Sequence, residues 1–339
     1  MTEMMKAVQL HAFGGPDNLL YEDVPRPVVG SDDVLVHVQA ASLNPPDWYL
    51  REGYRALPPE WWPAPAFPLI LGTDISGVVA AVGKNVTGFS IGDAVYSMVR
   101  FPERVMEGSG AYAEYVSVPS SELALKPRGI GYVQAAGAPM SLLTAWQFLV
   151  ETGHDESNPF QSFPHKAVPL SGRTVLVNGA GGGVGHLAVQ LAHWKGARVI
   201  AVASSRNEGL LRELGADEFI DYTKTAAESV VKNVDLVLDA VGGANMARFL
   251  RCIRPGGALF LVNPLGFSAH LVEAAQKEVT VSSTQVRSSG AQLSEAGRLL
   301  EKGVVRVVVD STYPLAMASA AHQRAAMGSI QGKIVLTNF

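Results

Sequence analysis

The clearest pattern of apolar and polar positions in this chain lies between residues 173 and 206. An apolar run at 174–177 leads into a glycine-rich turn, a helical pattern follows at 184–194, and a second apolar run covers 199–203. Short apolar runs without alternation are typical of strands that are buried on both faces of a parallel sheet. We therefore predict a βαβ unit here, with glycines at its first turn.

The same alternation of strands and helices continues further along the chain. Strands are predicted at 218–220, 234–239, 258–262 and 279–284, and a helix is predicted to begin near Gly243. Together with the βαβ unit this gives six strands with intervening helices. Such a series is typical of one doubly wound parallel sheet of the Rossmann type.

The N-terminal part has a different pattern, in which short β-branched runs are bounded by Gly, Pro, Asn and Asp. These runs predict strands at 34–40, 77–82, around Val95 and at 112–118. Several short strands separated by turn signals favour a small barrel-like domain. A helical stretch at 131–149, which Pro139 interrupts, follows as a linker.

The end of the chain returns to a mixed pattern. We predict a strand at 304–309, a helix at 316–327 and a strand at 333–336. These elements are expected to rejoin the first domain. The predicted fold class is therefore α/β, with a Rossmann sheet inserted in a β-rich domain. The expected boundaries are residues 1–129 plus 286–339 for the β-rich domain and residues 130–285 for the Rossmann domain.

Two further segments are predicted to be irregular. Residues 53–67 are rich in proline and tryptophan, and we expect them to form a loop at the mouth of a cleft. Residues 151–171 are polar and are interpreted as a surface insertion. They contain His154 and His165 without the cysteine or carboxylate spacing of a metal site, so no metal is predicted there.

Composition restricts the class of protein. The 339 residues carry a net charge of −4 and show no basic stripe, so nucleic acid is not an expected partner. We find no apolar stretch long enough for a membrane helix and no secretory signal, which favours a cytoplasmic protein without membrane contact. The only cysteine, Cys252, excludes internal disulfides and a cysteine-rich zinc site. It is interpreted as a plain buried residue.

The glycine-rich turn carries the most specific chemistry. Its residues are Ala180, Gly181, Gly182, Gly183, Val184 and Gly185. Glycines allow a tight turn and a close approach of phosphate oxygens, and the following helix offers free N–H groups to a pyrophosphate. Ala180, Gly182, Gly183 and Val184 are therefore predicted to bind a dinucleotide. The alternative is an ordinary glycine turn, which the flanking strands and helix disfavour.

The end of the second strand indicates which dinucleotide this is. An NAD-binding unit usually has an acidic residue there, whereas this strand is followed by Ser204, Ser205 and Arg206. Hydroxyl and guanidinium groups bind a 2′-phosphate, and we therefore predict NADPH. Tyr222 and Lys224 are further candidates for contact with that phosphate. The alternative for Arg206 and Lys224 is a solvated surface side chain.

Six short motifs are spread over nearly the whole chain. They are Asn44-Pro-Pro-Asp47; Gly72-Thr-Asp74 with Gly77, Gly83 and Gly92-Asp93; Gly110-Ala-Tyr112-Ala-Glu114-Tyr115; Leu143-Thr144-Ala145-Trp146; Ala180-Gly-Gly-Gly183-Val184-Gly185; and Gly332-Lys333-Ile-Val-Leu336. In this order they resemble the medium-chain dehydrogenase/reductase superfamily, and within it the zinc-free quinone oxidoreductase branch. The resemblance implies that the β-rich part is a GroES-like catalytic domain.

The resemblance also implies roles for single residues. Asn44 is expected near the nicotinamide, as a catalytic and cofactor-binding residue, and Tyr54 is a candidate proton donor. Thr144 and Lys333 are expected to contact the cofactor, as are Val241 and Asn263, which follow two strands of the nucleotide-binding sheet.

Each of these residues has a simpler alternative. Asn44 and Asp47 are also suitable for a helix-capping turn, Tyr54 for an aromatic pocket lining and Tyr112 for packing. Trp48, Trp62 and Phe67 form either an apolar wall for a flat substrate or part of the core. Zinc-dependent relatives use cysteine and histidine in the region of Asn44, and neither residue type stands there.

Three functions follow as hypotheses. The first is an NADPH-dependent, zinc-independent reductase of quinones or α,β-unsaturated carbonyls, which passes a hydride to a small electrophilic substrate without a Lewis acid. The second is an enoyl-thioester reductase, although no basic pocket for a large acyl carrier is evident. The third is a non-catalytic NADPH-binding sensor or structural protein. The resemblance further implies a homodimer, formed partly by pairing of the edge segment 279–284.

Overall fold

The computed structural model describes residues 3–55, 59, 62–101, 103–156, 161, 163–243, 246–263 and 271–338. The chain divides into two compact units. The first comprises Met1–Leu143, Arg287–Gly303 and Val307–Phe339, and the second comprises Thr144–Val286 and Val304–Arg306. The division lies within the helical stretch that the sequence interpretation assigned to the nucleotide-binding domain.

The second unit is built on six parallel strands in the order β11-β10-β9-β12-β13-β14. The strands are β9 (Thr174–Asn178), β10 (Arg198–Ala203), β11 (Glu218–Asp221), β12 (Val234–Asp239), β13 (Ile253–Leu261) and β14 (Thr280–Ser282). In chain order this is 3-2-1-4-5-6, which is the strand order of the Rossmann fold. The predicted doubly wound sheet is therefore confirmed.

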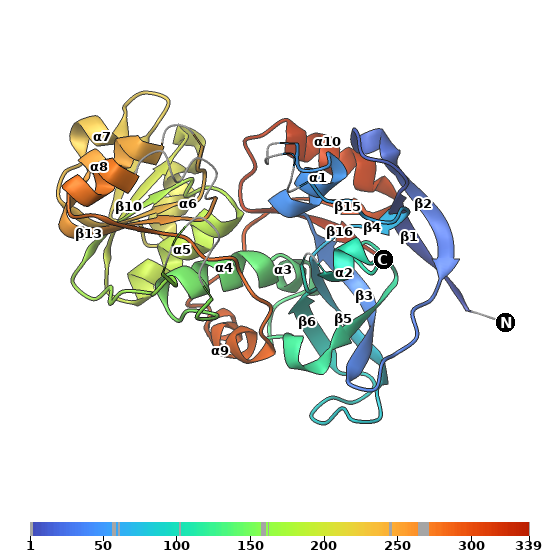
Figure 1. Ribbon diagram of the computed structural model, residues 1–339. Helices are drawn as coiled ribbons and strands as arrows, with labels where there is room; N and C mark the ends of the chain where they lie inside the picture. Colours follow the sequence, from blue (N-terminus) through green and yellow to red (C-terminus); the bar gives the residue numbers. More distant parts are fainter. Residues whose placement is uncertain are drawn as a thin grey trace. The chain divides into compact units, whose positions relative to one another are not determined.

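Helices cover both sides of this sheet. Figure 1 shows α7 (Ala227–Val230) and α8 (Leu271–Gln276) on one side of the strands and α5 (Gly183–Trp194) on the other. Helix α6 (Glu208–Glu213) packs beside β11. The central residues of β9, Val175, Leu176 and Val177, are fully buried, as a strand with both faces covered requires. This explains the unbroken apolar run in the sequence.

The helix predicted near Gly243 takes a different form. The structure has a 3-10 helix, η5 (Met246–Arg251), while residues 244 and 245 lie outside the described part. Strand β13 already begins at Ile253, so the segment is short, and short segments favour 3-10 geometry. Cys252 lies between η5 and β13 and is buried, as predicted. Burial raises the pKa of its thiol to about 11, which disfavours a reactive thiolate.

The first unit holds two sheets. Its seven-stranded sheet consists of β15 (Val309–Pro314), β16 (Lys333–Thr337), β3 (Asp33–Ser42), β5 (Asp74–Val82), β6 (Ala94–Met98) and β8 (Leu123–Leu125) in this order, with β7 (Tyr115–Pro119) paired to β3. A three-stranded sheet has the order β2 (Leu19–Pro25), β1 (Met4–Leu10) and β4 (Leu69–Ile70). The predicted β-rich N-terminal part is therefore confirmed.

The helices of the first unit are short. They are α1 (Pro45–Arg51), α2 (Glu103–Met106), α3 (Tyr132–Ala136), α9 (Gly290–Glu301) and α10 (Ala318–Ala326), while α4 (Pro139–Leu149) continues into the second unit. The predicted interruption of the linker helix at Pro139 is confirmed, because α3 ends before this residue and α4 begins at it.

The end of the chain rejoins the first unit as predicted. Strand β16 pairs antiparallel with β3, with Val335 opposite Ser42. The predicted strand at 304–309, however, is wrong, since β15 begins only at Val309. The backbone of Arg306 is bonded instead to a helix side chain: its N–H donates to Gln190 Oε1 at 2.8 Å, and its carbonyl accepts from Gln190 Nε2 at 3.0 Å.

The predicted insertion at 151–171 packs on its own unit. His165 is buried and lies 2.9 Å from Ser282 Oγ, at the end of β14. His154 lies 2.9 Å from the carbonyl oxygen of Gln285. Both predicted irregular segments contain residues outside the described part, including Trp61. Within the described part, no helix is both long and apolar enough to cross a membrane.

Candidate active site

Asn44 connects strand β3 to helix α1 in the first unit. Its backbone is extended, with φ −133° and ψ 156°, and prolines occupy the first two helical positions. The N–H of Asn44 donates to Asp47 Oδ2 at 2.7 Å, and the N–H of Asp47 donates to the Asn44 carbonyl at 2.9 Å. The predicted capping turn is therefore present, and it fixes the direction in which the Asn44 side chain leaves the backbone.

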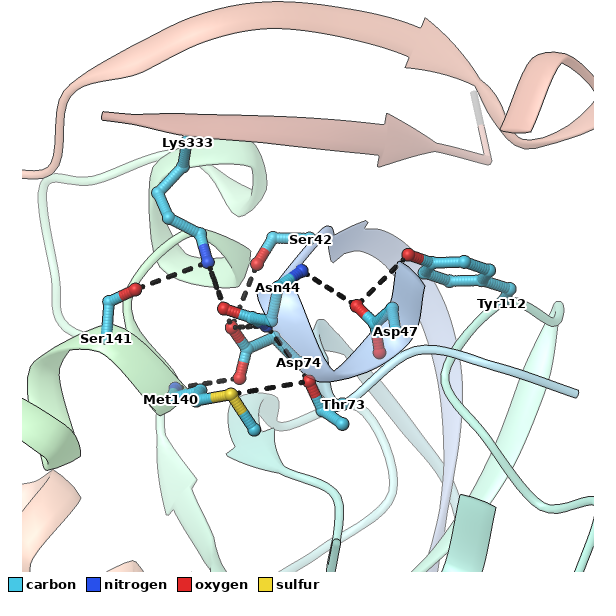
Figure 2. Close-up of polar contacts among 9 residues, drawn as sticks. All are labelled: Ser42, Asn44, Asp47, Thr73, Asp74, Tyr112, Met140, Ser141 and Lys333. Carbon is cyan, nitrogen blue, oxygen red and sulfur yellow. Dashed lines mark hydrogen bonds and ion pairs between the residues drawn. The ribbon is translucent and has the colours of Figure 1, made fainter. Parts of the chain in front are cut away.

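The Asn44 side chain is buried in a polar cluster (Figure 2). Its Nδ2 donates to Thr73 Oγ1 at 2.9 Å and to Asp74 Oδ2 at 2.8 Å, and its Oδ1 accepts from Lys333 Nζ. Both amide hydrogens are therefore engaged, and Oδ1 is the acceptor atom of the side chain. The amide is held rigidly, and it offers an acceptor rather than a donor.

Lys333 and Asp74 form a buried ion pair at the centre of this cluster. Lys333 Nζ lies 3.7 Å from Asp74 Oδ2 and 3.3 Å from Ser141 Oγ. The Asp74 carboxylate also accepts from Ser42 Oγ at 2.9 Å and from the N–H of Met140 at 2.7 Å. Burial raises the pKa of Asp74 and lowers that of Lys333, and the opposite charge of each partner opposes these shifts.

Asp47 belongs to a second polar group, which lies beside the cluster around Asn44 (Figure 2). Its Oδ2 accepts from the hydroxyl of Tyr112 at 3.2 Å, and that hydroxyl lies 3.2 Å from His322 Nε2. Burial raises the pKa of Asp47 to about 7 and lowers that of His322 to about 3. Tyr112 therefore does more than pack in the core, which was the sequence interpretation.

Tyr54, the candidate proton donor, follows α1. It is half-buried, has a positive φ of 51°, and packs its ring against Tyr49 and Phe101 at centroid distances of 6.0 and 6.5 Å. Burial raises the pKa of its phenol, and the charge of Asp47 raises it further. The phenol is therefore a weak acid in this environment, and its predicted role as proton donor stays a prediction.

The second unit carries the glycine turn between β9 and α5. Gly179 has φ 74°, and Gly182 is the N-cap of α5. A Cβ on Gly185 would lie 2.1 Å from the carbonyl oxygen of Gly179, so only glycine allows the helix to pack this closely on the turn. Among the described residues, a Cβ on Gly182 would meet a single atom within 4 Å, the carbonyl oxygen of Gly179 at 3.4 Å. The backbone at the start of α5 can therefore be approached closely, which fits a pyrophosphate group.

The residues predicted to distinguish NADPH from NADH lie at the ends of neighbouring strands. Ser205 and Arg206 are exposed after β10, and Tyr222 is exposed after β11. The N–H of Tyr222 donates to the carbonyl of Ala203 at 3.2 Å, which places these segments together. Lys224 forms an ion pair with Asp221 at 3.4 Å, whereas Arg206 has no such partner within the described part of the chain.

The remaining predicted cofactor residues are distributed as follows. Val241 is exposed, and its side chain lies against Gly179, while Gly242 lies against Asn263. These residues therefore gather at the carboxyl ends of β9, β12 and β13, where this fold binds ligands. Thr144 is buried within α4, next to Leu143, where the division between the units lies.

Several polar residues were not identified from the sequence as parts of a site. In the first unit these are Thr73, Asp74, Ser141 and His322, and in the second unit they are Asn178, Asn207 and Asp239. Asp239 Oδ1 accepts from Asn178 Nδ2 and from the N–H groups of Val241 and Gly242, at 2.8, 3.0 and 3.1 Å. The sequence signal for Asn178 and Asp239 was their position, since each stands at the end of a predicted strand of apolar residues.

The cluster around Asn44 does not fit a zinc ion. Zinc requires several cysteine, histidine or carboxylate ligands, and no group of three or more such residues gathers among the described residues. The cluster instead consists of an amide, hydroxyls, one carboxylate and the ammonium group of Lys333. A positive charge at its centre disfavours a second cation there.

Comparisons with known proteins bear on both units. Residues 30–128 match the alcohol dehydrogenase GroES-like domain, and residues 214–336 match the zinc-binding dehydrogenase family. The chain is 35% identical over 345 residues to the chloroplastic NADPH-dependent alkenal/one oxidoreductase of Arabidopsis thaliana, with 98% of this chain and 79% of the relative covered. It is 30% identical over 355 residues to the quinone oxidoreductase of Mus musculus, with 98% of both covered.

The chain belongs to the medium-chain dehydrogenase/reductase superfamily. Within it, the chain lies in the quinone oxidoreductase-like branch and is an oxidoreductase. The structure of the quinone oxidoreductase from Coxiella burnetii superposes with a TM-score of 0.85 at 31% identity, covering 99% of this chain and all of that one. The predicted pairing of a GroES-like domain with a Rossmann domain is therefore confirmed for this member of the superfamily.

Proposed function

We propose that this protein is a cytoplasmic, NADPH-dependent, zinc-independent reductase of quinones or α,β-unsaturated carbonyl compounds. The observation that carries the proposal is the glycine-lined N-terminus of α5, next to the end of β10, where Ser205 and Arg206 follow and the carboxylate of Asp221 on the neighbouring strand is paired with Lys224. Relatives named as quinone and alkenal reductases support the choice of substrate class.

In the proposed mechanism, the N–H groups at the start of α5 would bind the pyrophosphate of NADPH, and Arg206, Ser204 and Ser205 would bind its 2′-phosphate. The bound cofactor would supply a hydride from C4 of its nicotinamide. Hydrogen bonds to the developing enolate or hydroquinone oxygen stabilise the product of hydride addition. A proton then arrives from water or from a side chain such as Tyr54.

Asn44 has two candidate roles, to orient the nicotinamide ring or to bind the substrate carbonyl, and its geometry favours the first. Its amide hydrogens are taken by Thr73 and Asp74, so no donor is left for a substrate carbonyl, and Oδ1 lies beside Lys333 as the acceptor of the side chain. An acceptor suits the carboxamide N–H of the nicotinamide better than it suits a substrate carbonyl, which needs a donor. We therefore propose that Asn44 orients the nicotinamide ring, with Lys333 fixing its amide from behind.

Steady-state oxidation of NADPH with a panel of quinones and alkenones tests the proposal. We expect turnover with members of the panel and a large loss in the variant Asn44→Ala. NADPH binding without turnover of any member of the panel, and a rate of NADPH oxidation that Asn44→Ala does not change, would favour the non-catalytic sensor. Turnover only with acyl thioesters would favour the enoyl-thioester reductase.

The choice of NADPH is tested with two exposed arginines. Arg206 follows β10, and Arg212 lies on α6, where it pairs with Glu208 at 2.9 Å. We expect Arg206→Ala to weaken NADPH binding and to leave NADH binding unchanged, since only NADPH carries the 2′-phosphate. Arg212→Ala is the matched control and should change neither affinity. Equal affinities of the wild type for the two cofactors would contradict the proposal.

The homodimer implied by the family resemblance stays a prediction. Its expected edge segment, 279–284, is bonded to the insertion: the N–H of Ser283 donates to Gln161 Oε1 at 2.8 Å, and Thr284 Oγ1 lies 3.2 Å from His154 Nε2. A partner strand pairing at this edge would have to displace these contacts. Sedimentation of the wild type tests whether the dimer forms.

A further inference from the structure

A chain of buried polar side chains in the first unit runs from Arg51 to Asp47. Arg51 Nη1 lies 3.0 Å from His322 Nδ1, His322 Nε2 lies 3.2 Å from the hydroxyl of Tyr112, and that hydroxyl lies 3.2 Å from Asp47 Oδ2. None of the four side chains belongs to a residue more than 3% exposed. The chain connects α1 with α10 and with the segment before β7.

The direction of every hydrogen bond in this chain is determined. A guanidinium group can only donate, so His322 Nδ1 accepts from Arg51. The hydrogen of the neutral imidazole is then on Nε2, which donates to the oxygen of Tyr112. The hydroxyl hydrogen of Tyr112 is thereby directed to Asp47 Oδ2. The neutral state of His322 agrees with its burial and with the charge of Arg51, which together hold its pKa low.

The chain ends on a carboxylate that has few other partners, whereas Arg51 at its start also pairs with the carboxylate of Glu52. Asp47 Oδ2 accepts from Tyr112 and from the N–H of Asn44, whereas Oδ1 is buried without a hydrogen-bond partner among the described residues. Two hydrogen bonds to one oxygen favour the ionised form, and burial opposes it. The carboxyl group is therefore balanced between its two protonation states.

Charged and titratable groups on several elements act on Asp47. On β5 and β16, the charge of Asp74 disfavours ionisation and that of Lys333 favours it. Tyr54 lies close enough to be affected by the charge of Asp47. Tyr112 donates to Asp47 as a neutral group, His322 donates to Tyr112, and Arg51, which donates to His322, is itself paired with the exposed carboxylate of Glu52. Among these groups, Tyr112 is the one that bonds the carboxylate directly through its side chain.

We propose that Asp47 is a positioning residue: its carboxylate, which accepts from the hydroxyl of Tyr112 at the end of this chain, fixes the backbone N–H of Asn44, and its protonation loosens Asn44 and lowers hydride transfer. The inference rests on the proposed function, in which Asn44 orients the nicotinamide. A charge-assisted bond from N–H to a carboxylate, here 2.7 Å long, is stronger than a bond to a neutral carboxylic acid.

The pH profile of kcat/KM for NADPH oxidation tests the inference. The wild type should show activity that increases with pH as Asp47 ionises. Tyr112→Phe removes a hydrogen bond that favours the carboxylate, so the pH at which kcat/KM of this variant rises should be higher by about one unit. Asp47→Asn keeps an acceptor for the N–H of Asn44 but does not titrate, so its activity should be low and the rise should be absent.

Tyr96→Phe is the matched control for the loss of a buried hydroxyl. Tyr96 is buried in the same unit and donates to the carbonyl of Leu293 at 2.6 Å, away from Asp47. Its variant should keep the wild-type profile. An unmoved rise in Tyr112→Phe, an equal shift in Tyr96→Phe, or a rise that persists in Asp47→Asn would overturn the inference.

Infrared difference spectra separate this inference from the proposed function. The carbonyl band of the protonated Asp47 carboxylic acid should remain at low pH when the spectrum of Asp47→Asn, which keeps the bands of other buried carboxyl groups such as Asp74, is subtracted from that of the wild type. The same band should be retained to higher pH in Tyr112→Phe. Absence of this pattern overturns the inference whether or not the enzyme turns over. A wild type that shows the pattern but reduces no acceptor contradicts the proposed function instead. That result also contradicts a role of Asp47 in hydride transfer.

Discussion

The ammonium group of Lys333 lies 3.7 Å from the carboxylate of Asp74, and the two side chains are only 3% and 0% exposed. Lys333 begins β16 near the end of the chain, and Asp74 begins β5 in its first quarter. Both also bond the amide of Asn44, which therefore has its orientation set from two distant parts of the sequence. The ion pair is part of the support for the candidate active site.

Removal of the Lys333 ammonium should be strongly destabilising. Lys333→Met leaves the Asp74 carboxylate buried without its positive partner, and we expect a loss of about 3–5 kcal/mol in the free energy of unfolding. Urea denaturation measures this loss. Arg306→Met, which breaks the exposed pair with Glu213, is the control and should cost at most about 1 kcal/mol. Equal costs for the two variants would contradict the role assigned to the buried pair.

Two glycines of the dinucleotide turn should differ in their sensitivity to alanine. At Gly185 the added Cβ would lie 2.1 Å from a carbonyl oxygen, so Gly185→Ala should lower the stability of the fold by about 1–3 kcal/mol. At Gly182 the nearest atom is 3.4 Å away and φ is −85°, so Gly182→Ala should fold normally. Its methyl group should nevertheless obstruct the pyrophosphate and weaken NADPH binding roughly tenfold or more.

Thermal unfolding and NADPH titration of the two variants separate these effects. Gly209→Ala on α6 is the control, because a Cβ there meets nothing within 4 Å. Unchanged NADPH affinity in Gly182→Ala would show that the phosphate does not approach this turn.

The stability of the protein should decrease in acid partly because of His165. Burial lowers the pKa of this imidazole from 6.5 to about 4. The unfolded chain therefore takes up a proton at higher pH than the folded one, and the native state loses stability as the pH falls from 6.5 to about 4. By pH 4 the loss amounts to about 3 kcal/mol.

This contribution is measured as the difference between the wild type and His165→Gln in urea denaturation at each pH. Taking this difference removes the contributions of other titrating groups to the free energy of unfolding. One of them is Asp47, whose raised pKa makes the native state more stable as the pH falls over the same range. The exposed His193, changed to Gln, provides the control. A difference that does not vary with pH would contradict the buried, neutral state of His165.

Local patterns were sufficient for much of the fold. The central strands β9, β10 and β12 contain unbroken apolar runs because both faces of the sheet are covered there, and the capping turn at Asn44 is encoded within four residues. The strand predicted at 304–309 shows the limit. Its valines have high β propensity, but the side chain of Gln190 takes both backbone groups of Arg306 and leaves the segment without strand pairing there.

The site depends on contacts that no local pattern reveals. Lys333 is 289 residues from Asn44, and His322 is 210 residues from Tyr112. Asp74 was recognised only as part of a family motif, and its role as the partner of Lys333 became evident once β5 and β16 were placed on either side of β3. Polar residues in buried strands and helices indicated that a site was present. Their partners could not be identified from the sequence because the pairing depends on the tertiary fold.

The most direct test of the proposed reductase is transfer of deuterium from NADPH labelled at C4 to an alkenone, followed by mass spectrometry of the product. The proposed function predicts a product with one deuterium, bound to the carbon β to the carbonyl, and little product from Asn44→Ala. A wild-type protein that binds NADPH but yields no deuterated product, and reduces no quinone, would contradict it.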